Sequence, residues 1–434
     1  MKHSVYNNTI ILSPSYGLIY NTYTNMYVIL RINQYDAFLT LSIDQLKSQH
    51  PRLFSKLIEA GCVIDKDINE VQLLQDRIKS VDNQNQSYSL TVNPTMSCNF
   101  KCWYCYESHV KHSKMSPQTL EHTKKHIARV LSTQNLEKFH LSFFGGEPLL
   151  YYKDIVYPLS LHLQQACEKS GIPYSIGITS NGYLLTDSVI EEMQRLKITS
   201  FQITLDGDKD THNKTRYPYI GGDSYTRILE NVKKLLYANI SVVLRINYTK
   251  DNLPTTKNII NDLCPLSEEE KKILHVDFQQ VWQDSDNNMI DQELLEECKY
   301  AFEKNGIMVS TPIMNQVWNS CYADKEQQAL INYNGDVYKC TARDFVPGNR
   351  LGVLNEDGTI IWNEEKMKIR DGIRMSKEVC QHCRIAPICG GTCAQRGLDS
   401  RDSNTCIRGL EESGKDNVVL NQFYYSIVKN EISI

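Results

Sequence analysis

The sequence lacks the features of membrane proteins and of nucleic-acid-binding proteins. No apolar run approaches the roughly 20 residues that a membrane-spanning helix needs, and Met1-Lys2-His3-Ser4 leads into a mixed segment rather than a signal peptide. The 47 basic and 51 acidic residues nearly balance, so the charge gives no support for bulk binding to nucleic acid or to an acidic membrane. We therefore expect a cytoplasmic protein without nucleic-acid or membrane partners.

Cysteine, in contrast, is plentiful, with 14 residues in a chain of 434. Because disulfides are not expected in a reducing compartment, clustered cysteines indicate metal binding. Three lie close together at Cys98, Cys102 and Cys105, and seven more lie between residues 321 and 406. The other four stand alone, and we expect them to be small buried core residues: Cys62, Cys167, Cys264 and Cys298.

The first part of the chain, residues 5–85, has the pattern of a small separate unit. Short strands are predicted at Thr9–Ser13, Leu18–Tyr20 and Met26–Ile32, and a helix at Leu53–Ala60. Strands and helices of this size suit a winged-helix-like module, which could bind a peptide by adding it to a strand edge. The alternative is a cap that only covers the flank of the next domain.

From residue 87 onward, strands and helices alternate. Each of six predicted strands is followed by a helix, which indicates a parallel sheet that is either curled into a partial barrel or left open. In such folds the loops that follow the strands hold the active site. The strands are Tyr88–Val92, His140–Phe144, Tyr174–Thr179, Phe201–Leu205, Ser241–Asn247 and Leu274–Val281.

Four short motifs follow the first four of these strands. They are the cysteine loop, then Gly145-Gly146-Glu147-Pro148, then Ser180-Asn181-Gly182, and finally Asp206-Gly207. Ordinary iron–sulfur and structural zinc sites use four protein ligands. A loop with three cysteines therefore needs either a fourth cysteine from elsewhere or a ligand that is not protein. A zinc ribbon would account for the loop but not for the strand–helix series behind it.

The loop Cys98-x3-Cys102-x2-Cys105 with the Gly-Gly-Glu-Pro motif after the second strand resembles the radical S-adenosylmethionine (radical SAM) superfamily. The resemblance implies an α/β fold with a partial (β/α)6 TIM-like barrel. It also implies that these three catalytic cysteines bind a [4Fe–4S] cluster, whose fourth iron binds S-adenosylmethionine. Reductive cleavage of this cofactor then yields a 5′-deoxyadenosyl radical that abstracts a hydrogen atom.

The same resemblance assigns contacts to S-adenosylmethionine. It implies an aromatic residue on the adenine side, a Gly-Gly-Glu lining for the methionyl amine and two residues near the ribose. The methionyl carboxylate is implied to bind a threonine and an arginine, whose fork-shaped cation suits a carboxylate. In that order the residues are Tyr104; Gly145, Gly146 and Glu147; Ser180 and Asn181; Thr204 and Arg216.

The seven C-terminal cysteines resemble the SPASM pattern of iron–sulfur domains. The resemblance implies two auxiliary [4Fe–4S] clusters, and hence three clusters in all. One auxiliary cluster is assigned to Cys321, Cys340 and Cys393, and the other to Cys380, Cys383, Cys389 and Cys406.

The first auxiliary set is one ligand short. Some relatives have an extra cysteine about six residues before the first of the seven, but here that position is Asn315. One hypothesis is an open iron site that takes a substrate thiolate or another ligand. The alternative is that Cys298 completes the set.

SPASM enzymes of this type mostly modify peptides. The resemblance divides the chain into a winged-helix-like leader-recognition module (1–85), a radical SAM core (86–308), a SPASM domain (309–412) and a C-terminal helix (413–434). We expect an oxidoreductase that oxidatively modifies a ribosomally made precursor peptide (RiPP), through a thioether or a carbon–carbon or carbon–oxygen crosslink. Its partners would be this leader-bearing peptide and an external one-electron reductant of flavodoxin or ferredoxin type.

Two other functions are alternatives. An anaerobic sulfatase-maturing enzyme would form formylglycine, but relatives of that kind carry an aspartate directly after the second SPASM cysteine, where this chain has Thr341. A non-catalytic iron–sulfur electron carrier or scaffold would not bind S-adenosylmethionine.

Overall fold

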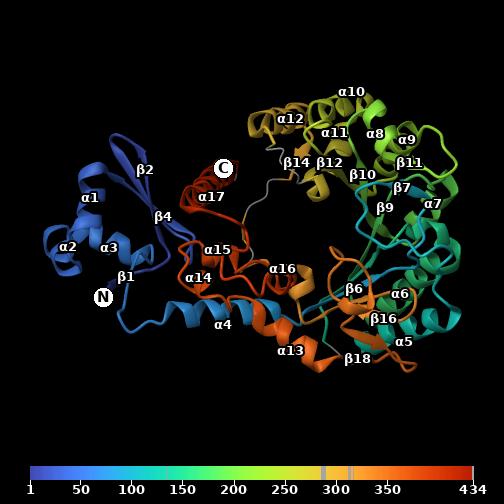
Figure 1. Ribbon diagram of the computed structural model, residues 1–434, viewed down its shortest axis with the longest axis horizontal. Coiled ribbons are helices and arrows are strands. Elements are labelled where there is room, and N and C mark those ends of the chain that lie inside the picture. Colours follow the sequence, from blue (N-terminus) through green and yellow to red (C-terminus); the bar gives the residue numbers. More distant parts are fainter. Residues whose placement is uncertain (134, 285–289, 311–313, 316, 433–434) are drawn as a thin grey trace. The chain divides into compact units, whose positions relative to one another are not determined.

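The computed structural model describes residues 1–133, 135–284, 290–310, 314–315 and 317–432 (Figure 1). The chain forms two compact units. Unit 1 comprises residues 1–84, 312–326 and 364–434, and unit 2 comprises residues 85–311 and 327–363. The segment predicted as one SPASM domain, 309–412, thus contributes to both units, and its residues 311–313 and 316 lie outside the described ranges.

An 11-stranded sheet forms the centre of unit 2, in the order β14-β13-β12-β10-β9-β8-β6-β15-β16-β17-β18. The strands from β14 to β15 pair in parallel, and those from β15 to β18 pair antiparallel. Among the described strands no pairing joins β14 to β15, so the barrel is open. The strands are β6 (Ser87–Val92), β8 (Lys138–Phe143), β9 (Tyr174–Ser180), β10 (Ile198–Leu205), β12 (Ser241–Tyr248), β13 (Leu274–Gln280), β14 (Met308–Val309), β15 (Gln328–Ile331), β16 (Asp336–Tyr338), β17 (Gly352–Leu354) and β18 (Ile360–Trp362).

Helices follow the parallel strands and lie outside the curved sheet (Figure 1). Their starts are set by side chains that accept a backbone N–H of the first turn: Thr186 caps α7, Asp223 caps α9 and Asp291 caps α12. The six predicted strand–helix units are therefore confirmed. The helices are α5 (Pro117–Thr133), α6 (Tyr157–Ser170), α7 (Asp187–Arg195), α8 (Lys209–Thr215), α9 (Ser224–Tyr237), α10 (Ile259–Leu263), α11 (Glu268–Lys272) and α12 (Gln292–Lys304).

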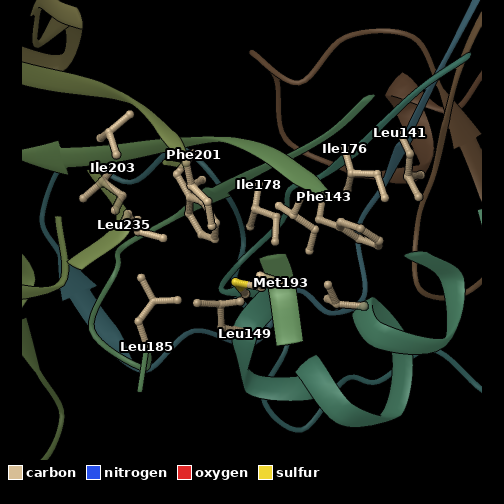
Figure 2. Packing of buried hydrophobic residues seen from close by; sticks show 14 of the residues in the cluster. Leu141, Phe143, Leu149, Ile176, Ile178, Leu185, Met193, Phe201, Ile203 and Leu235 are labelled. Atoms are coloured by element: carbon tan, nitrogen blue, oxygen red, sulfur yellow. The ribbon is translucent and has the colours of Figure 1, made fainter. Parts of the chain in front are cut away.

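The core of unit 2 lies between this sheet and its helices. Figure 2 shows Phe143, Ile178 and Phe201 from adjacent strands packed close to Met193 of α7. Burial of each such side chain contributes about 1.5–3 kcal/mol. The sheet is thus a rigid base for the loops that leave its strands.

The N-terminal part of unit 1 is an antiparallel sheet with three helices. Strands β2 (Asn7–Ser13), β3 (Tyr16–Asn21) and β4 (Met26–Arg31) pair in that order, and β1 (Lys2–His3) pairs with β5 (Val63–Ile64). Helix α3 (Pro51–Glu59) was predicted, whereas α1 (Ile32–Thr40) and α2 (Ile43–Gln49) were not. A sequence signal did exist for α2, since Ser42 and Gln45 form a capping box.

Both faces of this small sheet are covered within unit 1. Ile19 and Leu30 pack with residues of α1 and α3, while Leu18 and Tyr20 pack with Phe423 and other residues of the C-terminal part. Among the described helices none is long and apolar enough to cross a membrane. The remaining helices of unit 1 are α4 (Glu70–Asp82), α13 (Glu364–Ile373), α14 (Glu378–Gln381), α15 (Ala386–Cys389), α16 (Ala394–Asp399) and α17 (Glu412–Ile432).

Candidate functional site

The predicted motifs meet at the carboxyl edge of the parallel sheet. The cysteine loop follows β6, the Gly-Gly-Glu-Pro turn follows β8, and the Ser-Asn-Gly turn begins at the last residue of β9. Within the cysteine loop, β7 (Phe100–Cys102) pairs antiparallel with β11 (Arg216–Pro218). This pairing places Arg216 directly opposite Cys102, which lies 114 residues earlier in the chain.

The three thiols of the loop lie near one another. Burial is the main cause that raises the pKa values of these thiols, and the neighbouring thiols contribute as well. Cys102 and Cys105 raise the pKa of Cys98, and Cys102 contributes to the rise in the pKa of Cys105 to about 12. Three thiolates in this space would repel one another, so a cationic group is needed to hold all three deprotonated. The donor set fits a soft metal centre such as iron–sulfur.

Among the described residues, no group of three or more His, Cys, Asp or Glu side chains is arranged to hold one metal ion. A cluster of several irons separates its thiolates more widely than one ion does.

The glycines of the second motif allow close packing against the segment that leads into the cysteine loop. Gly145 has a φ of 95°, and a Cβ at Gly146 would lie 2.3 Å from the carbonyl oxygen of Ser97. The N–H of Gly146 donates to the carbonyl of Thr95. A side chain at either glycine would thus displace the backbone that carries Cys98.

Glu147 links the second and third motifs. Its buried carboxylate accepts hydrogen bonds from the Ser180 hydroxyl (2.8 Å), the Asn181 backbone N–H (2.8 Å) and the Leu149 backbone N–H (3.0 Å). Burial raises the pKa of Glu147, and these donors oppose the rise. The carboxylate therefore fixes the start of the Ser-Asn-Gly turn.

Asn181 in turn reaches the cysteine loop. Its side-chain amide donates to Asn99 at 2.8 Å and lies 4.0 Å from the sulfur of Cys98. The first three predicted motifs are thus connected through a single set of hydrogen bonds.

A buried chain of polar side chains lies beside Cys102. Arg216 donates to the Tyr104 hydroxyl at 2.9 Å, and Tyr104 donates to Asp206 at 2.7 Å. The Nε of Arg216 is buried with no hydrogen-bond partner among the described residues. A buried donor without a partner is costly, so this guanidinium suits an additional anionic ligand such as a carboxylate.

Two residues of this region were not among the predicted site residues. Asp206 directly follows β10, and burial raises the pKa of its carboxyl group to about 6. Asn247, near the end of β12, forms a hydrogen bond with Tyr104. Because both residues lie at the ends of predicted parallel strands, their positions in the sequence could have indicated that they belong to the site. The predicted Thr204 is half-buried in β10, in register with Arg245 of β12.

The loop after Cys105 is tied to the segment after Cys340, also within unit 2. The backbone N–H of Ser108 donates to Asp344 at 2.8 Å, and the Tyr106 hydroxyl donates to the carbonyl of Thr341. Asp344 therefore anchors the loop that carries the third thiol.

The C-terminal cysteines divide between the two units. Four of them line one cavity in unit 1, together with Ile385, Leu410 and other residues, and burial together with the neighbouring thiols raises the pKa values of Cys380 and Cys383. This convergence of four soft donors fits an iron–sulfur cluster. The four are Cys380, Cys383, Cys389 and Cys406.

Cys321 and Cys393 also lie together in unit 1. They share a side-chain hydrogen bond, which raises the pKa of Cys321 and lowers that of Cys393. Asp324, which pairs with Arg370 at 3.2 Å, accepts the N–H of Ala394, so its buried carboxylate joins the two cysteine segments. The third predicted ligand, Cys340, belongs to unit 2.

The isolated cysteines are mostly core residues. Cys62, Cys167 and Cys298 are fully buried, whereas Cys264 is half-buried. The thiol of Cys298 donates to the carbonyl of Leu253 at 3.4 Å in an apolar cluster of unit 2. Packing accounts for Cys298 without a role as a metal ligand.

Comparison with known families gives two matches. The radical SAM superfamily model matches residues 92–263, and the SPASM model, an iron–sulfur cluster-binding domain, matches residues 321–384. These ranges contain the cysteine loop, the Gly-Gly-Glu-Pro and Ser-Asn-Gly turns, and the first SPASM cysteines.

Individual relatives are distant. The radical SAM cyclopropyl synthase TigE of Paramaledivibacter caminithermalis is 22% identical, over 79% of this chain and 76% of that protein. A cysteine-type anaerobic sulfatase-maturating enzyme of Clostridium perfringens is 25% identical, over 73% of this chain and 91% of that protein. The structure of Streptococcus suis SuiB bound to its precursor peptide SuiA has a TM-score of 0.51 at 17% identity, and covers 91% of this chain and 96% of that one.

Proposed function

Because this chain belongs to the radical SAM superfamily and carries a SPASM iron–sulfur domain, we propose that it cleaves S-adenosylmethionine reductively and oxidatively modifies a ribosomally made precursor peptide. The observation that carries the proposal is the meeting of three thiols with Glu147 and Arg216 at one carboxyl edge of the sheet. We further propose a cytoplasmic location, where such thiols stay reduced.

The thiols of Cys98, Cys102 and Cys105 hold a [4Fe–4S] cluster in this proposal. When bound, the cluster and S-adenosylmethionine would supply radical abstraction of a hydrogen atom from a peptide carbon, and the auxiliary clusters would supply an acceptor for the second electron. Arg216 binds the methionyl carboxylate through its unpaired Nε, and Thr204 assists it.

Other side chains position these groups. Asp206 accepts the Tyr104 hydroxyl, and this fixes the ring that packs on the adenine side. Glu147, next to Gly145 and Gly146, orients Ser180 and Asn181 toward the ribose. Because these hydrogen bonds are in place before the cofactor arrives, little reorganisation is needed when it binds.

The SPASM cysteines hold two further clusters in this proposal, which makes three in all. Cys380, Cys383, Cys389 and Cys406 supply four ligands from one cavity. Cys321, Cys340 and Cys393 supply three, and the core packing of Cys298 supports an iron site that is open to a substrate thiolate or another ligand.

Residues 1–85 recognise the leader of the precursor in this proposal. In the small sheet, β4 pairs with β3 alone among the described strands, so its outer edge is suited to strand addition by an extended peptide. Exposed Met26 and Ile29 lie on this strand. The similarity to SuiB, a protein solved with its precursor peptide, extends over nine-tenths of the chain and supports this function.

Sulfatase maturation is the second candidate, because a relative of that activity is 25% identical. It predicts turnover of a short sulfatase-motif peptide with no leader requirement. In such enzymes an aspartate stands at the position of Thr341, and the nearest carboxylate in this chain is that of Asp344. This carboxylate is already engaged in hydrogen bonds with Ser108, which counts against sulfatase maturation.

The test is anaerobic reconstitution with iron and sulfide, followed by dithionite and S-adenosylmethionine. We expect 5′-deoxyadenosine, about twelve irons per chain, and loss of two hydrogens from a precursor peptide encoded beside the gene. Absence of 5′-deoxyadenosine contradicts the radical function and favours an electron carrier or scaffold. Turnover of the sulfatase peptide alone favours the second candidate.

The leader module has its own test. Ile29→Glu adds a charge at an exposed side chain of the edge strand β4, and we expect it to raise KM for the full precursor while the leaderless core peptide reacts at the unchanged rate. The matched control is Leu73→Glu on α4, a similarly exposed residue. Equal effects of the two variants contradict leader binding at β4.

A further inference from the structure

The cysteine loop includes a two-stranded ribbon whose two faces differ. In the β7–β11 pairing, Cys102 lies opposite Arg216 and Lys101 lies opposite Tyr217. Directly opposed residues of an antiparallel pair point to the same side, and successive residues alternate. Cys102 and Arg216 therefore share the inner face with the buried Phe100, and Lys101 and Tyr217 share the outer one.

The outer face is aromatic and exposed. Trp103 continues the alternation beyond β7 and is 57% exposed, and Tyr219 continues it beyond β11 and is 58% exposed. The backbone N–H of Tyr219 donates to Asn99, so the ribbon extends past its assigned strands. Ile220 follows and is 88% exposed. Neighbouring large apolar side chains left in solvent in this way mark an interaction surface.

The charge of the ribbon is positive, although the whole chain has a net charge of −4. Residues 98–106 and 211–222 contain Lys101, Lys214 and Arg216 and no acidic residue. Lys101 and Lys214 are exposed. A partner that binds this face is therefore acidic, because opposite charges steer the encounter.

We propose that the outer face of this ribbon, defined by Lys101, Trp103, Tyr217, Tyr219 and Ile220, is the docking surface of the external electron donor, a small acidic one-electron protein of flavodoxin or ferredoxin type. This inference rests on the proposed function, since it requires a redox cluster on the cysteine loop. Because Cys102 is a residue of the ribbon, a donor on the outer face is separated from the thiol by only the ribbon's thickness.

The size and character of the surface match this kind of partner. Electron-transfer complexes have small interfaces, and their speed depends on electrostatic steering more than on tight binding. A few exposed aromatic side chains, with Lys101 on the face and Lys214 at the end of α8 just before β11, suit a transient contact. One electron leaves the reduced donor and one enters the enzyme, and dithionite performs the same reduction without docking.

The experiment compares two reductants on the reconstituted full-length enzyme, without peptide. The variants are Tyr217→Ser with Tyr219→Ser, and Lys101→Glu with Lys214→Glu. The rate of 5′-deoxyadenosine formation is measured with a reduced bacterial flavodoxin and with dithionite. We expect the charge reversal to lower the flavodoxin-driven rate about tenfold at low salt, while the dithionite-driven rate and the cluster's electron paramagnetic resonance spectrum stay unchanged.

Matched controls lie at the opposite edge of the sheet. Tyr237 ends α9 just before β12, and Lys304 ends α12 just before β14, so both lie where strands begin rather than where they end. Both are exposed. We expect Tyr237→Ser and Lys304→Glu to leave both rates unchanged.

Binding of flavodoxin to the enzyme, measured by titration, is a second readout that needs no turnover. We expect weaker binding by both ribbon variants and a loss of the salt dependence in the charge-reversed one.

Unchanged binding and unchanged flavodoxin-driven rates overturn the proposal, and so does an equal loss of rate with both reductants. A rise in KM for the precursor peptide with unchanged flavodoxin kinetics assigns the face to the peptide instead. Failure of the wild type with dithionite refutes the proposed function, and the binding measurement still tests the surface.

Discussion

The two cysteine-rich regions of this chain are built in different ways. In unit 2, Cys98, Cys102 and Cys105 lie on a loop in which Asn99, Ser108 and the β7 backbone are held by hydrogen bonds to residues distant in the sequence. In unit 1, four cysteines spread over 27 residues line a cavity, and two of them, Cys380 and Cys389, lie on α14 and α15, which have four residues each. The first region is organised by the sheet, whereas we expect the second, whose cysteines lie on short helices and loops, to depend on a bound metal for its structure.

The largest effect should follow from removal of the three loop thiols. Replacing Cys98, Cys102 and Cys105 together with Ala abolishes 5′-deoxyadenosine formation and removes about four irons per chain. Circular dichroism and the melting temperature should change little, because the sheet and not the cluster holds this loop. The control is Cys167→Ala in the core. Unfolding of the triple variant would contradict the comparison.

The opposite pattern is expected in unit 1. Cys389→Ala removes one of four ligands from the cavity, and we expect loss of the second auxiliary cluster and rapid proteolysis within residues 378–410. The reason is that metal-binding energy is folding energy in segments with little apolar core. Limited proteolysis and iron analysis measure both effects. A variant that resists proteolysis like the wild type would refute the dependence on metal.

A smaller effect is expected for the carboxylate that joins two motifs. Glu147→Gln places an amide N–H₂ where donors from Ser180, Asn181 and Leu149 now converge, so at least one donor loses its acceptor. We expect affinity for S-adenosylmethionine to fall about tenfold, which corresponds to about 1.4 kcal/mol and the typical cost of one lost buried hydrogen bond. Calorimetric titration of the reconstituted enzyme checks this, with the exposed Glu121→Gln as control.

The smallest effect is expected for Cys298→Ala. The thiol packs in a core and donates to a backbone carbonyl, so its loss should cost about 1 kcal/mol of stability and no iron. Chemical denaturation and iron analysis measure the two quantities. Loss of about four irons per chain would instead make Cys298 the missing auxiliary ligand and remove the open iron site.

Much of the sheet could be predicted from local patterns. The strand predicted at Tyr174–Thr179 is β9 (Tyr174–Ser180), and that predicted at Ser241–Asn247 is β12 (Ser241–Tyr248). Short elements were harder, because α2 has seven residues and one buried side chain, which is too little to produce a periodic pattern. The addition of β15 to β6 joins residues more than 230 positions apart, and no local pattern encodes that pairing.

The sequence alone determined the chemistry that this protein has available. The spacing of ten cysteines, the order of the turns after successive strands and the overall α/β class are local properties of the chain, so they can be read without a structure. They define which donors exist and at which edge of a parallel sheet they lie.

The tertiary structure alone decided which of these groups meet. It connects Arg216 to Asp206 through Tyr104, engages Asp344 with Ser108, and turns Lys101 and Tyr217 to the outer face of the ribbon that carries Cys102. Such partnerships depend on the register between distant strands. Register results from packing of the whole sheet and not from the residues of any one segment.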